Sequence, residues 1–205
     1  MVNLPSYTLL RVRGIPVKVH VTYILFVVGL LCSFQFAQDT EWAARSLRII
    51  FYLFVSILAH EFGHAICAAS IGHKVNQITV YPIGGLADIH MVNRDPVDKL
   101  KIALSGPFVN FLLFSVFVFF ENLTLDSFCI LNLLLGSLNL LPITSFDGGV
   151  ALNAAMSKLS DEETATAWTL RISIGIVIAV AILAVYAKSF LLGIAALFML
   201  IYSLA

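Results

Sequence analysis

The stretch His60-Glu61-Phe62-Gly63-His64 places two histidines four residues apart, with a glutamate directly after the first. Residues of an α-helix advance by about 100° each, so these imidazoles lie about 40° apart on one face and one turn apart along it. Both can therefore reach the same metal ion. Glu61 projects near that face and can accept a proton from water without binding the metal. The spacing predicts a zinc-dependent hydrolytic site, with His60 and His64 as ligands and Glu61 as the catalytic base.

The chain around this stretch is unusually hydrophobic. Of its 205 residues, 60% are hydrophobic and only 12% are charged, and the mean hydropathy is +0.98. Soluble domains average about 45–50% apolar and about 25% charged residues. The composition therefore predicts an all-α polytopic membrane protein. Two core histidines that bond across helices are the alternative explanation of the motif, but ionisable groups inside a membrane span are costly and usually functional.

Two histidines leave a catalytic zinc site short of its usual three protein ligands. Most of the other acids fall in predicted loops or in the charged cluster of Asp161, Glu162 and Glu163. Asp147 differs, because it follows an apolar span that Pro142 breaks, and the Gly148–Gly149 pair frees the backbone beside it. We therefore predict Asp147 as the third ligand of one Zn²⁺ per chain. A membrane metalloprotease with a glutamate as third ligand is a rival, which the absence of a later glutamate at suitable depth disfavours.

Six apolar segments approach the roughly 20 residues that a membrane-spanning helix needs. The predicted core spans cover residues about 47–71, 98–120 and 125–157, and the flanking spans cover about 20–37, 168–186 and 189–204. The third core span is expected to be bent or broken after Pro142. Ala187–Lys188 leaves only a very tight turn, so the last two spans should form an antiparallel hairpin.

The distribution of positive charge predicts the orientation. With the N-terminus inside, the inner segments hold nine lysines and arginines and the outer segments hold three. This favours cytoplasmic termini. His60, His64, Asp147 and the polar start of the 98–120 span then fall in one shallow layer near the cytoplasmic face.

The segment Lys74–Arg94 has a different character from the apolar spans. Alternation and β-branched residues in Val75–Val80 predict a strand, and Leu86–His90 predicts a return strand after the Gly84–Gly85 turn. Pro16–Val21 is similar and is expected to pair with this hairpin. Unpaired backbone cannot face lipid, so we expect a small sheet at the cytoplasmic membrane face.

Four motifs together resemble the site-2 protease family of intramembrane zinc metalloproteases. They are HEFGH, SGPFVN (Ser105–Asn110) as G-P-x-x-N, PIGG (Pro82–Gly85) as P-x-G-G, and NLLPITSFDGG (Asn139–Gly149) as N-x-x-P-x-x-x-x-D-G. The resemblance covers about residues 15 to 157. It implies a metalloendopeptidase that cuts a peptide bond in or near the transmembrane segment of a membrane protein. The chain departs from the pattern at Phe146, where the family often has leucine. It shows no PDZ or CBS domain, so we expect one integral membrane protease domain over residues 1–205, of the compact bacterial or archaeal type.

Peptide-bond hydrolysis also requires residues that contact the substrate. Asn139 and Asn110 are candidate donors to the developing oxyanion, although either can instead bond helix backbone. Val80, Gly84 and Gly85 are candidate members of a strand edge to which an unwound substrate adds. A lid or packing element without substrate contact is the alternative reading of that hairpin.

The expected partners are a transmembrane protein substrate, the lipid bilayer, and a second copy of the chain or a regulatory membrane partner. No basic stretch suits nucleic acid. We expect a multi-pass protein of the cell membrane, with His20 as an interfacial or gating residue and with His73 and His90 solvated. A non-catalytic scaffold or transporter with a vestigial metal site is the main rival, which the intact Glu61 disfavours.

Overall fold

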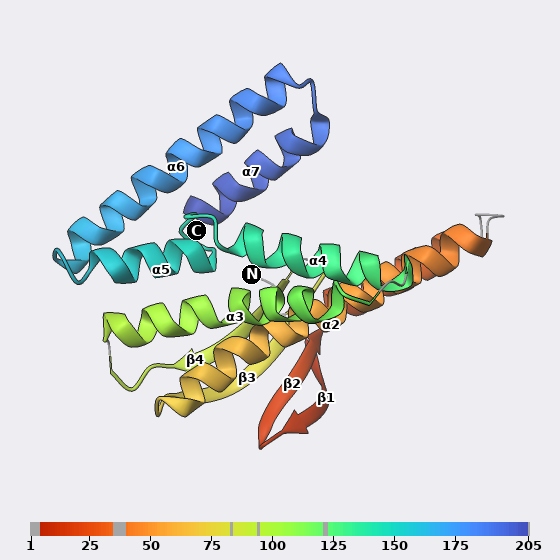
Figure 1. The fold of residues 1–205 in the computed structure, drawn as a ribbon, viewed down its shortest axis with the longest axis horizontal. Helices are drawn as coiled ribbons and strands as arrows, with labels where there is room; N and C mark the ends of the chain where they lie inside the picture. The colour runs from red at the N-terminus through yellow and green to blue at the C-terminus, as the bar shows by residue number, and fades with distance from the viewer. Residues whose placement is uncertain (1–4, 35–39, 83, 94, 121–122, 205) are drawn as a thin grey trace.

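The computed structural model describes residues 5–34, 40–82, 84–93, 95–120 and 123–204 (Figure 1). These residues form a mainly helical protein with one small sheet, as the composition and the β-like segments predicted. The strands are β1 (Ser6–Val12), β2 (Ile15–His20), β3 (Lys74–Tyr81) and β4 (Gly84–His90). The helices are α1 (Val21–Phe34), α2 (Thr40–Ser70), α3 (Pro96–Phe117), α4 (Leu123–Asn139), α5 (Asp147–Met156), α6 (Glu162–Tyr186) and α7 (Phe190–Leu204).

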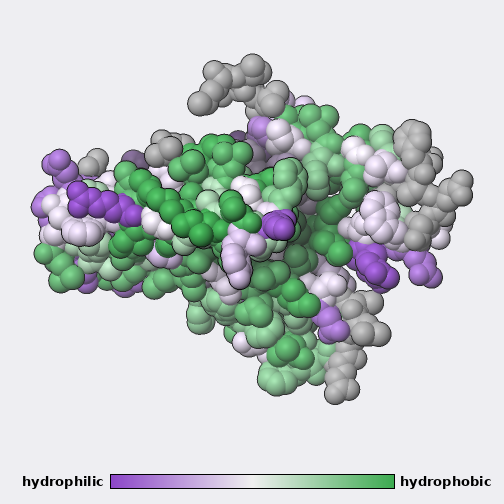
Figure 2. Space-filling view, turned by 90° about the horizontal axis from the view of Figure 1, so that it is seen from above, coloured by the Kyte–Doolittle hydropathy of each residue, from purple (hydrophilic) through white to green (hydrophobic). Residues whose placement is uncertain are grey.

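Three of these helices, α2, α3 and α6, are long and apolar enough to cross a membrane. The apolar parts of α1, α4 and α7 are shorter, so the structure supports three spans by length where the sequence predicted six. Residues 35–37 of the predicted first span lie outside the described residues. Hydrophobic side chains cover most of the face seen in Figure 2, and hydrophilic ones gather mainly toward its two ends. The chain is therefore a membrane protein with at least three candidate spanning helices.

The sheet has the strand order β1-β2-β3-β4, with β2 parallel to β3 and the other two pairs antiparallel. The predicted β3–β4 hairpin and its pairing with the 16–21 segment are confirmed, whereas β1 was not anticipated. Val80 pairs with Val19 on one side and with Gly85 on the other, and its side chain is fully buried. The prediction that Val80 lies at a strand edge is therefore wrong, because β2 covers that side of β3. On the opposite side of β3, the edge strand of the sheet is β4.

The sheet packs against the middle of α2. Val19, Ile57 and Val80 form a buried cluster there, with Leu53 and Leu58 packed around it. Ile57 lies one helical turn before Glu61, so this cluster fixes how α2 meets the sheet. The packing holds the glutamate at the level of β4.

The predicted break after α4 is confirmed and returns the chain as α5. The backbone turns through residues 140–146 with short hydrogen bonds, including Ile143 N–H to Leu141 O at 2.7 Å and Phe146 N–H to Ile143 O at 2.8 Å. A Cβ atom on Gly148 would lie 2.6 Å from the Leu141 carbonyl oxygen, so only glycine lets α5 start this close to the loop. Asp147 consequently occupies the first turn of α5 with its position fixed by backbone contacts.

The α6–α7 hairpin covers the loop that precedes Asp147, and its two helices run antiparallel as predicted (Figure 1). Ile143 from the loop packs against Val177 of α6 and Met199 of α7 in a buried cluster. Thr144 donates from its backbone N–H to Ser173 of α6 at 3.3 Å. The last two helices therefore support the segment that carries Asp147.

Candidate metal centre

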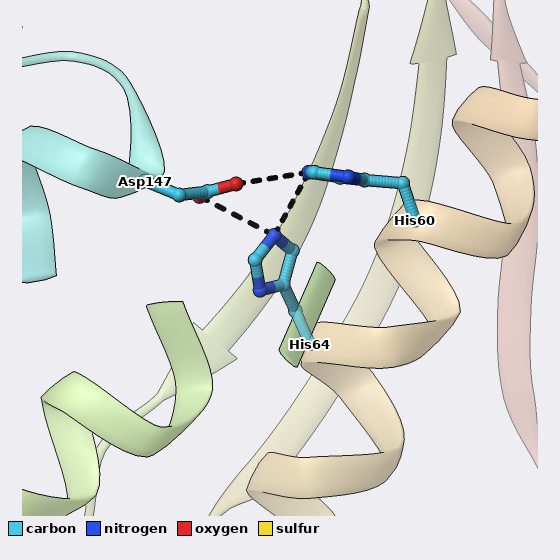
Figure 3. Close-up of side chains that lie close together, drawn as sticks. All are labelled: His60, His64 and Asp147. Carbon is cyan, nitrogen blue, oxygen red and sulfur yellow. Dashed lines mark hydrogen bonds and ion pairs between the residues drawn. The ribbon is translucent and has the colours of Figure 1, made fainter. Parts of the chain in front are cut away.

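His60, His64 and Asp147 converge on one point between α2 and the start of α5 (Figure 3). The Nε2 atom of His60 lies 3.0 Å from Asp147 Oδ2, and that of His64 lies 3.3 Å from Asp147 Oδ1. The two Nε2 atoms are 3.1 Å apart. The predicted meeting of the three side chains is therefore present, although more than 80 residues of sequence separate the histidines from the aspartate.

The outer nitrogens of the two imidazoles have acceptor partners. Nδ1 of His64 lies 2.7 Å from the backbone carbonyl of Ile102, and Nδ1 of His60 lies 2.6 Å from Oδ1 of Asn110. A carbonyl oxygen can only accept, so each imidazole donates its N–H from Nδ1. The Nε2 atoms then direct lone pairs at the convergence point, which is the tautomer that a metal-ligating histidine adopts.

The three inner atoms form a donor set that a cation fits. Two lone pairs and a carboxylate face one another, and Asp147 Oδ2 is buried without a hydrogen-bond partner among the described residues. Ligand atoms about 2.0–2.1 Å from a tetrahedral zinc ion lie about 3.3–3.4 Å from each other. The spacings of 3.0–3.3 Å are close to that value. One divalent ion among these atoms would satisfy the carboxylate and both imidazoles together.

Glu61 lies beside this centre and is directed toward the sheet rather than toward the other three side chains. Its side chain is 6% exposed, and its Oε2 accepts a hydrogen bond of 2.8 Å from the backbone N–H of Ala87 in β4. A Cβ atom on Gly85 would lie 2.6 Å from Glu61 Oε1, so the bare backbone of Gly85 makes room for the carboxylate. The arrangement bonds one carboxylate oxygen to β4 and places the other beside Gly85.

The sequence profile of peptidase family M50 matches residues 48–125, which include both histidines and Glu61. A zinc metalloprotease of Methanocaldococcus jannaschii is 36% identical over 163 residues, covering 75% of this chain and 46% of that protein. The solved structure titled site-2 protease, from the same organism, is 29% identical, with a TM-score of 0.68 over 97% of this chain and 94% of that one. The chain belongs to peptidase family M50.

A third relative supports this assignment at lower identity. Stage IV sporulation protein FB of Bacillus subtilis is 26% identical over 149 residues, covering 69% of this chain and 48% of that protein. The chain thus spans just under half the length of the curated relatives named here. The family profile ends before Asp147, so the position of the aspartate at the site is known from the fold and not from the profile match.

Zinc is the cofactor that the M50 family and this donor set indicate together. Two imidazole nitrogens and one carboxylate are the ligand number and type of catalytic zinc sites, which keep a further position open. The three side chains available here match that pattern.

Gly106 of the SGPFVN motif lies directly against the metal centre. A Cβ atom on it would lie 2.8 Å from His60 Nε2 and would overlap His64 more severely. We expect Gly106→Ala to weaken zinc binding about 10–100-fold, because the added methyl group must displace at least one imidazole. Competition with a chromophoric zinc chelator measures the change in zinc affinity.

Gly175→Ala is the matched control for this substitution, since a Cβ atom at Gly175 in α6 meets no atom within 4 Å. This variant should bind zinc like the unsubstituted protein. Equal zinc affinity in the Gly106 and Gly175 variants would show that the motif glycine does not shape the centre.

Both asparagine candidates make hydrogen bonds to other groups of the protein. Asn110 is fully buried behind His60, and both N–H groups of its amide have acceptors at Ser56 O and Asn132 Oδ1. Asn139 donates from Nδ2 to the Leu135 carbonyl one turn earlier in α4, at 3.0 Å. Asn110 is thus a hydrogen-bond partner of His60, and Asn139 makes the helix-backbone bond that was its alternative.

Several residues around the site were not predicted. Ser56 and Asn132 contact Asn110 behind His60, and the backbone groups of Ile102 and Ala87 bond His64 and Glu61. Ser56 lies four residues before His60 on the same helix, so its spacing could have identified it. The others become neighbours only through helix and sheet packing.

One expectation about the remaining histidines is wrong. His73 was predicted to be solvated but is 6% exposed, accepts a hydrogen bond from Val92 N–H at 3.2 Å and lies 3.4 Å from Asp98. The turn after α2 folds it under the start of α3, which explains its burial. His90 is exposed as predicted. The ring of His20 contacts that of Tyr81, with ring centroids 4.8 Å apart and ring planes tilted by 35°.

Proposed function

We propose that the chain is an intramembrane zinc metalloendopeptidase that hydrolyses a peptide bond in or near the transmembrane segment of a membrane protein. The observation that carries this proposal is the convergence of His60, His64 and Asp147 beside Glu61, with both histidines and Glu61 on α2, a helix apolar enough to cross a membrane. A scaffold or transporter does not need an unpartnered carboxylate oxygen facing two imidazole lone pairs with a second carboxylate beside them.

His60, His64 and Asp147 would hold the zinc ion, and Glu61 would handle the proton. A zinc ion bound there would supply a Lewis acid that polarises the scissile carbonyl and makes water easier to deprotonate. Glu61 would take that proton on the oxygen that does not bond Ala87, and later give it to the leaving amine. The bond from Ala87 N–H fixes the rotamer of the carboxylate, so little reorganisation is needed at the moment of transfer.

Substrate would bind along β4, because Gly84 and Gly85 lie on the edge strand and Gly85 adjoins Glu61. A helical segment must unwind before its carbonyl can be attacked, and an extended segment can add to a free strand edge. Backbone groups alternate in direction along a strand. The N–H and C=O of Gly85 therefore point to the same side of β4 as the Ala87 N–H that bonds Glu61.

Substitution of the exposed Leu86 by lysine should change which bond is cut. An unchanged cleavage position would favour the packing role of the hairpin.

The finer membrane topology is also part of the proposal. We propose that α1, α4 and α7 cross the membrane with α2, α3 and α6, in the cell membrane and with both termini in the cytoplasm. Helices of 14 to 17 residues extend only about 21–26 Å, so local thinning of the bilayer or snorkelling of flanking side chains would accommodate them. The nine-to-three distribution of lysine and arginine supports the orientation. Protease protection of tags placed at both ends measures it, and an external tag would contradict it.

The decisive experiment uses the full chain in proteoliposomes with candidate single-span substrates. We expect cleavage within or beside the transmembrane segment, loss of cleavage after a zinc chelator, and its return when zinc is added. Mass spectrometry of the products locates the cut. A protein that carries no stoichiometric zinc and cuts none of the substrates would support the scaffold alternative instead.

A further inference from the structure

Behind His60, three polar side chains from three different helices meet in the interior. They are Ser56 of α2, Asn110 of α3 and Asn132 of α4, and all three have 0% exposure. Such groups are costly inside a membrane protein unless they are fully hydrogen-bonded. Asn132 belongs to none of the sequence motifs and does not contact the metal centre itself, so its burial needs an explanation.

Every polar atom of the two amides has a partner. Asn132 Nδ2 donates to the Phe128 carbonyl and to Ser56 Oγ, each at 2.9 Å. Asn132 Oδ1 accepts from Asn110 Nδ2 at 2.9 Å. Asn110 Nδ2 also lies 3.3 Å from the Ser56 carbonyl, and Asn110 Oδ1 faces His60 Nδ1 at 2.6 Å. The network is therefore complete, and it ends on a metal-binding side chain.

The network has a direction that begins at a backbone carbonyl. Phe128 O can only accept, so the Nδ2 group of Asn132 must face it, and Oδ1 must face Asn110. Asn110 must then present its own Nδ2 to Asn132, which leaves Oδ1 for His60. If either amide were flipped, two acceptors or two donors would face each other in a buried site.

We propose that Asn132 is a positioning residue that fixes, through Asn110, which nitrogen of His60 faces the metal centre. Because Asn110 can only accept at its Oδ1, His60 donates from Nδ1 and keeps the Nε2 lone pair toward Asp147 and His64. Outer partners of metal-bound histidines fix the tautomer and ring orientation and affect metal affinity. Here this control extends one residue further, to a side chain on a helix that carries no metal ligand.

The test compares zinc affinity and the absorption spectrum of the Co²⁺-substituted protein for Asn132→Leu, Asn110→Leu and the double variant. We expect Asn132→Leu to weaken zinc binding about 10-fold and to change the Co²⁺ band, with a larger effect for Asn110→Leu. Since Asn132 acts through Asn110, its substitution should add almost nothing in the Asn110→Leu background. A purely structural role would lower thermal stability and leave the Co²⁺ band unchanged. The effects of the two substitutions on zinc affinity would then be additive.

Two further variants keep the result interpretable. Asn132→Asp has almost the same shape but loses the donors to Phe128 O and Ser56 Oγ, so it tests the network without a change in packing. Cys129→Ala alters a buried neighbour on α4 and should leave zinc affinity unchanged. Wild-type zinc affinity and Co²⁺ spectra in both Asn132 variants, or full additivity in the double variant, would overturn the inference.

The inference rests on the proposed function only in taking His60 as a zinc ligand, and the two can fail separately. If the unsubstituted protein binds no zinc, the proposed function fails with it. If that protein binds zinc and the Asn132 variants bind it equally well, the metal centre stands and the positioning role alone is lost.

Discussion

Glu61→Gln should retain stoichiometric zinc and lose about 10²–10⁴-fold of the rate of peptide cleavage, the range for loss of a general acid–base group. The glutamine oxygen can still accept the hydrogen bond from Ala87 N–H, so the side chain keeps its place. Its amide nitrogen then stands where the second carboxylate oxygen was, and it cannot take a proton. Single-turnover cleavage of a reconstituted single-span substrate, measured beside zinc content, separates the loss of proton transfer from the loss of metal.

Glu163→Gln provides the matched control, because it makes the same chemical change at an exposed residue in the first turn of α6. That variant should cleave and bind zinc like the unsubstituted protein. A Glu61→Gln protein that carries zinc and still cleaves at an undiminished rate would remove Glu61 from the mechanism.

Asp147→Asn should remove both zinc and activity, with zinc affinity lowered more than about 100-fold, beyond the range for loss of an outer partner. The substitution replaces one of the oxygens facing the imidazoles by an N–H₂ group or rotates it away, and it removes the negative charge of the ligand set. The backbone of α5 should not change, because Gly148 and its neighbours, rather than the aspartate side chain, determine its close approach to the loop. Zinc titration and circular dichroism together measure affinity and retention of the helices.

Asp126→Asn is the corresponding control, since Asp126 is exposed in the first turn of α4. Full zinc occupancy and normal cleavage in the Asp147 variant would mean that the third ligand is a different group. The ligand role that the resemblance of NLLPITSFDGG to the family motif implies for Asp147 would then be wrong. Loss of zinc in both aspartate variants would point to a general effect on folding.

The metal centre was largely predictable because its residues have distinctive spacing. A pair of histidines at positions i and i+4 must share a helix face, whatever the tertiary structure, and an apolar chain makes such a pair functional rather than incidental. Asp147 could be identified because a proline and two glycines mark a broken helix beside it. Such features depend on short stretches of sequence, so they can be recognised without knowledge of the tertiary packing.

The helices were less predictable in length than in position. Each of the six apolar segments contains helix in the structure, but helix ends depend on capping and on the turns that follow. Asp95, for example, caps α3 by accepting from Val97 N–H at 2.9 Å, so α3 begins at Pro96, two residues before the predicted start. The apolar segment at 125–157 divides into α4 and α5 at the predicted break.

The sequence by itself determined the metal-binding residue types, the hydrophobic class of the fold and the β3–β4 hairpin. Only the tertiary structure decided that Val80 is interior, that Asn110 supports His60 rather than facing a substrate, and that His73 is buried. Each of these depends on what another segment places beside the residue: β2 beside Val80, α4 beside Asn110, and the start of α3 beside His73. Side-chain spacing along one element says which face a residue is on, but not which distant element will cover that face.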